Sequence, residues 1–258
     1  MLAEFNFKYT SPIVCTAIHN GHDVSEEVNK NFAVSESIRL MEEDPYTDRF
    51  TDFASNTIIG RTSRFEVDLN RSIEKCIYLK PEDAWGLRTR KDKPSDNVIS
   101  KSLEEYKIFY STAKNHFTQL EKKYGRFFVY DIHSYNHHRK GSTAEFDDPK
   151  LNPEIIIGTN NMPEKWLSLV DKIQKKLIMF DYFGRQLDAR VNVNFPGGHF
   201  SRWIHNNFPD SACCIAIEFK KIWMNEWTGE IYEDKLNKLI SALNSTFPLI
   251  EAELEKYK

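Results

Sequence analysis

Cysteine is scarce in this chain of 258 residues: only four are present, and no two have the spacing of a zinc knuckle or a redox pair. The N-terminus lacks a basic region followed by an apolar stretch, so we expect no secretory signal. No apolar run approaches the length that spans a bilayer. We therefore predict a cytoplasmic protein without a membrane partner, whose reduced thiols pack as small hydrophobic side chains.

Charge of one sign is not in excess either. The chain has 35 Lys and Arg against 38 Asp and Glu, giving a formal net charge of −3. Such a balance creates no global field to attract nucleic acid or anionic lipid. We interpret the short basic runs at residues 88–91 and 220–221 as solvated faces. The composition thus disfavours a nucleic-acid partner and leaves a small molecule as the expected one.

The hydrophobic pattern predicts one large α/β domain over residues 1–258, with a sheet covered by helices. We expect strands at residues 13–19, 65–69, 127–133, 154–158, 189–195 and 213–224. We expect helices at residues 103–124, 165–183 and 234–255, and exposed loops at 89–100 and 137–149. Internal repeats and low-complexity tracts are missing from the sequence.

Residues of metal-ligand type gather where three expected strands end. The first apolar run leads to His19, the run at 127–130 leads to His133, and the run from 213 leads to Glu218. Ligands of open α/β sheets bind outside the carboxyl ends of the strands, so these side chains are expected to meet. Two histidines and one carboxylate suit a catalytic zinc, which keeps one position open for water and polarises a carbonyl. Glu218 is then a plausible general base.

Each of these residues has a simpler interpretation when it is taken alone. A single histidine at a strand end is more often a hydrogen-bonded structural residue than a ligand. Glu218 also fits a solvent-facing position of its strand. The hypothesis of a zinc site therefore depends on the joint occurrence and order of the residues.

The segment of residues 60–71 adds a candidate receptor for an acidic substrate. In a strand, Glu66, Asp68 and Asn70 would share one face, and Arg71 would emerge with Asn70 at the end. An arginine can hold a carboxylate through two parallel hydrogen bonds, with the amide of Asn70 as a further donor. An internal ion pair of Arg71 with Asp68 or Glu66 is the competing interpretation.

Six blocks of sequence then resemble the N-formylglutamate amidohydrolase family, which is itself similar to the zinc carboxypeptidases. In chain order they are AIHNG at 17–21, EEDPYTD at 42–48, VDLNR at 67–71, DIHSY at 131–135, FPGGH at 195–199 and IE at 217–218. The resemblance implies a mixed, largely parallel central sheet sandwiched by helices, as in zinc carboxypeptidases, and one zinc ion per chain.

The resemblance also implies roles for single residues. His19 and His133 match the metal histidines, Glu218 matches the general base, and Asn70 with Arg71 matches the pair that holds the substrate carboxylate. The third ligand stays open: the acidic block favours Asp44 or Glu42, with His22 lining the pocket, and His22 as a ligand is the alternative. Arg61 or Arg64 matches the arginine that polarises the scissile carbonyl, and Gly197, Gly198 and His199 are expected to form a loop over the pocket.

The function implied is zinc-dependent hydrolysis of N-formylglutamate to formate and glutamate. A close alternative keeps the same machinery for another acylated amino acid or a short peptide. The alternative from another class is a non-catalytic binding protein on the same fold; its sequence sign would be a missing metal histidine or base, and neither is missing.

Overall fold

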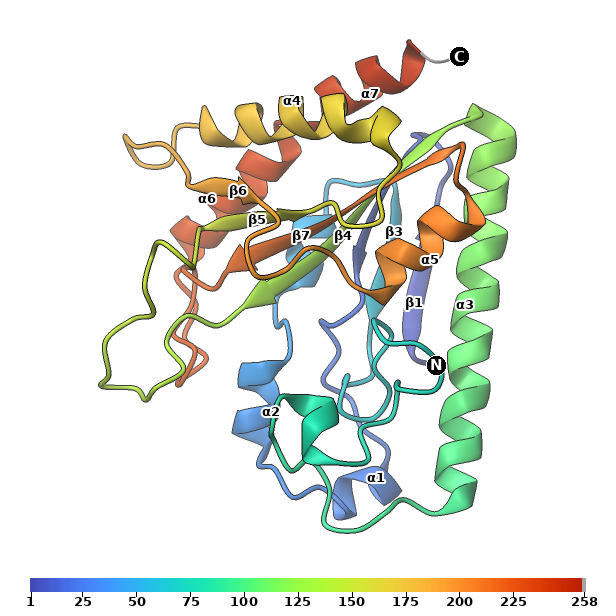
Figure 1. Cartoon of the computed structure of the whole chain (residues 1–258), viewed down its shortest axis with the longest axis vertical. Helices are drawn as coiled ribbons and strands as arrows, with labels where there is room; N and C mark the ends of the chain where they lie inside the picture. Colours follow the sequence, from blue (N-terminus) through green and yellow to red (C-terminus); the bar gives the residue numbers. More distant parts are fainter. Residues whose placement is uncertain (257–258) are drawn as a thin grey trace.

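The computed structural model describes residues 1–256 and is built around a seven-stranded mixed sheet (Figure 1). The strands are β1 Ala3–Phe7, β2 Ile13–Ala17, β3 Asn56–Gly60, β4 Phe127–Tyr135, β5 Ile155–Gly158, β6 Ala189–Val191 and β7 Ala212–Lys220. Their order in the sheet is β1-β3-β2-β4-β7-β5-β6, and only the β1–β3 and β5–β7 pairings are antiparallel. This confirms the predicted mixed, largely parallel sheet.

Helices cover both faces of this sheet (Figure 1). They are α1 Glu26–Lys30, α2 Glu36–Glu42, α3 Asp96–Tyr124, α4 Leu167–Ile178, α5 His199–Asn207, α6 Glu233–Asn244 and α7 Phe247–Glu255. Three 3-10 helices are η1 Thr47–Thr51, η2 Pro81–Ala84 and η3 Glu164–Trp166. Helices α3 and α5 pack on one face, and α4, α6 and α7 pack on the other. Within residues 1–256, no helix combines the length and the apolar character that crossing a membrane requires.

The two central strands position the chemistry. Strands β4 and β7 pair in parallel over nine residues each, which places His133 directly beside Glu218. Every residue of β4 is buried, because helices cover both sides of the sheet. This burial explains the continuous apolar runs before His133 and Glu218, which are typical of parallel strands.

Three helix predictions are wrong at their boundaries. The helix expected at 165–183 is the 3-10 helix η3 followed by α4, which ends at Ile178. The other two differ for local reasons. Helix α3 begins at Asp96 rather than at 103, because the Ser95 side chain accepts a hydrogen bond from the Val98 amide and caps it. The single helix expected at 234–255 is interrupted between α6 and α7, where Pro248 occupies the first turn of the second helix. Proline lacks the amide hydrogen that a continuous helix would need there.

The strand expected at residues 65–69 is also wrong, because the segment folds as consecutive turns. Its backbone is held by a side chain rather than by a neighbouring strand: the Arg90 guanidinium donates to the carbonyls of Phe65 (3.0 Å) and Tyr78 (3.1 Å). Strands β1 and β3 escaped prediction. The strand expected at 189–195 stops at Val191, since Asn192 and Asn194 adopt left-handed backbone conformations.

Candidate metal centre and active-site cavity

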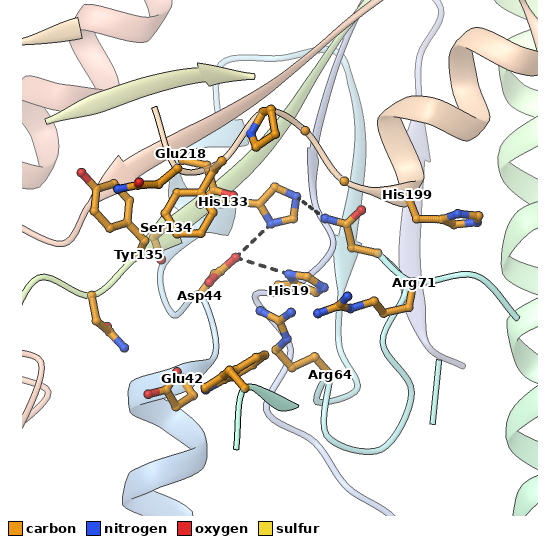
Figure 2. Close-up of a pocket in the computed structure, with 18 of the residues that line it drawn as sticks. His19, Glu42, Asp44, Arg64, Arg71, His133, Ser134, Tyr135, His199 and Glu218 are labelled. Atoms are coloured by element: carbon orange, nitrogen blue, oxygen red, sulfur yellow. Dashed lines mark hydrogen bonds and ion pairs between the residues drawn. The ribbon is translucent and has the colours of Figure 1, made fainter. Parts of the chain in front are cut away.

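Three ligand-type side chains converge at the carboxyl ends of β2 and β4 (Figure 2). His19 follows β2, His133 belongs to β4, and Asp44 lies two residues beyond the end of α2. One ligand atom of each residue lies within 4.8 Å of the others, and all three side chains are buried. Asp44 Oδ2 is 3.0 Å from His133 Nδ1 and 3.5 Å from His19 Nδ1, so both rings present the same nitrogen to one carboxylate oxygen.

The opposite nitrogen of each ring faces a second carboxylate. His19 Nε2 lies 2.7 Å from Asp68 Oδ1, and His133 Nε2 lies 3.2 Å from Asp131 Oδ1. A carboxylate in this position holds the ring proton on Nε2 and leaves the Nδ1 lone pair free for a metal. His19 Nδ1 is buried without a hydrogen-bond partner. The cluster therefore contains a buried nitrogen whose lone pair a bound cation would satisfy. The residues present therefore fit a zinc ion in their number and chemistry.

A buried lysine holds the segment that carries Asp44. Lys221, which is 1% exposed, donates from Nζ to the carbonyls of Met41 (2.7 Å) and Glu43 (2.8 Å) at the end of α2. On the other side of Asp44, the Thr47 hydroxyl donates to the Asp44 carbonyl (2.6 Å). The carboxylate is thus presented by a loop that is fixed at both ends.

The structure places the three alternatives for the third ligand differently. Asp44 lies between the two histidines, whereas Glu42 forms an ion pair with Arg139 (2.7 Å) on the cavity wall. His22 is outside the cavity, with its Nδ1 atom 2.5 Å from Glu43 Oε2. The expectation that His22 lines the pocket is therefore corrected, because the buried Glu43 carboxylate holds its ring away from the cavity.

Asp68 connects the cluster of His19, Asp44 and His133, called below the metal-type cluster, to the cavity. Its fully buried carboxylate accepts hydrogen bonds from the Tyr78 hydroxyl, from Arg64 Nη2 (3.0 Å) and from the backbone N–H of Asn70 (2.7 Å), besides facing His19. Burial alone raises the pKa of this carboxyl, but the Arg64 charge and the hydrogen bonds outweigh it and hold the pKa well below its usual range. Asp68 was expected to share one face of a strand with Glu66 and Asn70, and it is instead buried between His19, Arg64 and Tyr78.

Glu218 lies beside His133 and faces the cavity (Figure 2). No hydrogen bond or ion pair within residues 1–256 engages its carboxylate. Burial raises its pKa to about 8, and the nearby Asp44 charge adds to this effect, while His133 and Arg64 oppose it. A carboxylate of this kind can accept a proton and return it near neutral pH.

A cavity of about 840 Å³ opens above the cluster. Arg64 reaches it with a guanidinium that is anchored on Asp68 and lies over the Trp85 ring, 5.1 Å from the ring centroid. Arg61 lies outside the cavity and pairs with Glu4 at the surface. Of the two arginines expected to polarise a carbonyl, the structure therefore brings only Arg64 to the cavity.

Asn70 and Arg71 line the same cavity and are fixed by different means. The Asn70 Oδ1 atom accepts from the Phe200 amide in the first turn of α5 (2.9 Å), which turns the Nδ2 atom towards His133 Nε2 at 3.4 Å. A side chain on Gly198 would collide with the Asn70 amide, so a glycine is needed at this position. Arg71 is 44% exposed, and its Nε atom is 3.8 Å from Asp68 Oδ2. This contact is the ion pair with Asp68 that was the competing interpretation of the sequence, and the exposed part of the guanidinium still lines the cavity.

Several cavity residues were missed by sequence reasoning, and His199, which was expected, lines the cavity. Among the missed residues are Lys75, Trp85, Tyr135, Arg139, Phe195, Arg202 and Lys221. Arg202 could have been found, since it follows His199 by three residues at the start of a helix and so shares its face. The others reach the cavity from loops and strand ends whose paths the sequence pattern does not define.

The fold and this centre define a class: an α/β protein with a histidine–carboxylate cluster at the carboxyl ends of parallel strands and a carboxylate of raised pKa beside it. The family model of N-formylglutamate amidohydrolase matches residues 11–223. The chain therefore belongs to the N-formylglutamate amidohydrolase family, whose members are hydrolases of amide bonds.

The fold is shared by solved structures, among them one from Ralstonia eutropha and one from Agrobacterium tumefaciens. The N-formylglutamate amidohydrolase from Ralstonia eutropha JMP134 is similar with a TM-score of 0.79 and 13% identity, over 100% of this chain and 99% of that one. A gene product from Agrobacterium tumefaciens is similar with a TM-score of 0.63 and 17% identity, over 97% and 96% of the two chains. None of the curated proteins compared with this sequence matches it.

Proposed function

We propose that this protein is a zinc-dependent amidohydrolase that cleaves the amide of a small N-acyl acidic amino acid, with N-formylglutamate as the reference substrate. The observation that carries the proposal is the convergence of two histidine Nδ1 atoms on Asp44, beside the unpaired carboxylate of Glu218. His19, Asp44 and His133 would hold the ion, which when bound supplies positive charge to polarise a carbonyl and acidify water. Family membership supports amide hydrolysis, and the cations of the cavity support an anionic substrate.

Residues of the chain bind the substrate, stabilise charge on the carbonyl oxygen and transfer the proton. Arg71 and the Asn70 amide bind the carboxylate of the amino-acid part, which fixes the amide above the cluster. Arg64 stabilises the negative charge that develops on the carbonyl oxygen, and its own orientation is set by Asp68 and Trp85. Glu218 accepts a proton from the attacking water and returns it to the nitrogen of the leaving amine. Water and amide are thereby converted into a carboxylic acid, formate for the reference substrate, and a free amino acid.

The decisive experiment measures metal content and turnover together. Elemental mass spectrometry of the wild type should find about one zinc per chain after incubation with zinc, and His133→Ala should lose it. His22→Ala is the matched control, since His22 lies outside the cluster, and it should retain the metal. A wild type that binds no added zinc would contradict the proposal.

Glu218→Gln separates binding from chemistry. The amide keeps the shape of the side chain but cannot take a proton, so zinc content should persist while turnover of N-formylglutamate falls by about 10²–10⁴-fold. Near-wild-type turnover would remove Glu218 from the role of base. A wild type that holds zinc and ligand without any turnover would instead indicate a non-catalytic binding protein.

A further inference from the structure

The cavity has two sides that differ in chemistry, with the cluster of His19, Asp44 and His133 between them. In Figure 2, Arg71 and His199 lie on one side of the cluster, and Tyr135 lies on the other with Ser134 and Glu42. We call these the arginine side and the aromatic side. An amide held above the cluster would extend one part of the substrate to each side.

The arginine side is suited to carboxylates. Besides Arg71 it contains Lys75 and Arg202, and within residues 1–256 neither of these two side chains has an ion-pair or hydrogen-bond partner. These cations can take both carboxylates of an acidic amino acid. The proposed function already uses this side for the amine part of the substrate, so the acyl part points to the aromatic side.

The aromatic side carries little free charge. Phe195 is 37% exposed and packs against Tyr135, with 5.3 Å between the ring centroids. The Tyr135 hydroxyl donates to the Pro153 carbonyl, which fixes the ring against which Phe195 packs. Both cations of this side are engaged: Arg139 pairs with Glu42 at 2.7 Å, and the buried Lys221 donates to the carbonyls of Met41 and Glu43. The wall formed by the aromatic side therefore presents apolar ring surface and cations that are already engaged. Such a surface favours a neutral group with an apolar chain.

A formyl group cannot use this wall, because its carbonyl carbon carries only a hydrogen atom. The cavity of about 840 Å³ is also large for N-formylglutamate: its volume lies near the upper end of the range for drug-sized ligands, roughly 300–1,000 Å³. We propose that the aromatic side is an acyl-binding subsite, and that the preferred substrates are N-acyl acidic amino acids with a neutral acyl group of several carbon atoms. This inference rests on the proposed function and specifies its substrate class.

The test compares N-formyl-, N-acetyl- and N-hexanoyl-glutamate in the zinc-loaded wild type, Phe195→Ala and Phe183→Ala. Each methylene covered by the wall should raise kcat/KM about fourfold, so the hexanoyl compound should exceed the formyl one by at least about tenfold. Phe195→Ala should reduce this ratio to below about threefold. Phe183→Ala is the matched control, because Phe183 is 58% exposed and lies outside the cavity, and it should keep the wild-type ratio.

Binding separates this inference from the proposed function. In zinc-loaded Glu218→Gln, calorimetry should show that N-hexanoyl-glutamate binds at least about tenfold more tightly than N-formylglutamate. If the hexanoyl compound shows this gain in affinity but the wild type hydrolyses none of the compounds, the proposed function is refuted and the acyl-binding subsite is retained. Equal or weaker binding of the hexanoyl compound, or a preference for formyl in turnover, would overturn the subsite, even if amide hydrolysis is observed.

Discussion

Replacing Asp68 by asparagine removes the charge that links the metal-type cluster to Arg64. The variant keeps the shape of the side chain, but the neutral amide no longer pairs with the Arg64 guanidinium, which is only 14% exposed. Losing one partner of a buried ion pair costs about 3–5 kcal/mol of stability. The amide is also a weaker partner for His19 Nε2, which lies 2.7 Å from Asp68 Oδ1. Removing such an orienting carboxylate typically weakens zinc binding by about 10–100-fold.

Two measurements on the same samples test this reasoning. Urea unfolding of the zinc-free protein reports the loss of stability, and competition with a chromophoric chelator reports zinc affinity. Tyr78→Phe is the control: it removes one hydroxyl donor to the same carboxylate but leaves the contact with His19 intact. It should cost about 1–2 kcal/mol and leave zinc affinity unchanged. If Asp68→Asn bound zinc as tightly as the wild type, the carboxylate would have no part in orienting His19.

Three further predictions concern other parts of the molecule. Lys221→Met removes the ammonium that holds the Asp44 loop, so zinc affinity by chelator competition should fall at least about tenfold, whereas unchanged affinity would make Lys221 purely structural. Arg71→Ala should raise KM for N-formylglutamate more than it lowers kcat, and unchanged steady-state kinetics would exclude a substrate contact. Burial lowers the pKa of His205 to about 4, below its unfolded value of about 6.5, so its contribution to stability is present above pH 6.5 and is lost as the pH falls. His205 should account for about 2 kcal/mol of the change in unfolding free energy between pH 7.5 and pH 5, so urea unfolding of His205→Gln should show a loss smaller than that of the wild type by about this amount.

Sequence alone predicted the central strands and the two histidines, because burial on both faces of a parallel sheet leaves a strong apolar pattern. The apolar runs before His133 and Glu218 are of this kind. His133 and Glu218 lie side by side, each two residues before the end of its strand. The carboxyl ends of neighbouring parallel strands meet at one edge of the sheet, so the strand order brings these side chains together.

What escaped prediction depends on side chains that hold loops. Residues 65–69 alternate like a strand, but Arg90 binds the backbone of this segment from 25 residues further along the chain. Asp44 could not be distinguished from Glu42, since the choice depends on Arg139 and on the buried Lys221, both of which come from the far half of the chain. Tertiary contacts of this kind leave no local periodicity.

The order of the strands has a consequence for synthesis and truncation. Strand β7 is the last strand in the chain, yet it lies in the interior of the sheet, between β4 and β5. Until it has formed, β4 is an unprotected edge whose nine residues are all destined for burial. Exposed apolar edges of this kind pair with other chains and aggregate. A nascent or truncated chain that ends before Ala212 would therefore contain all three residues of the metal-type cluster and still depend on chaperones to stay in solution.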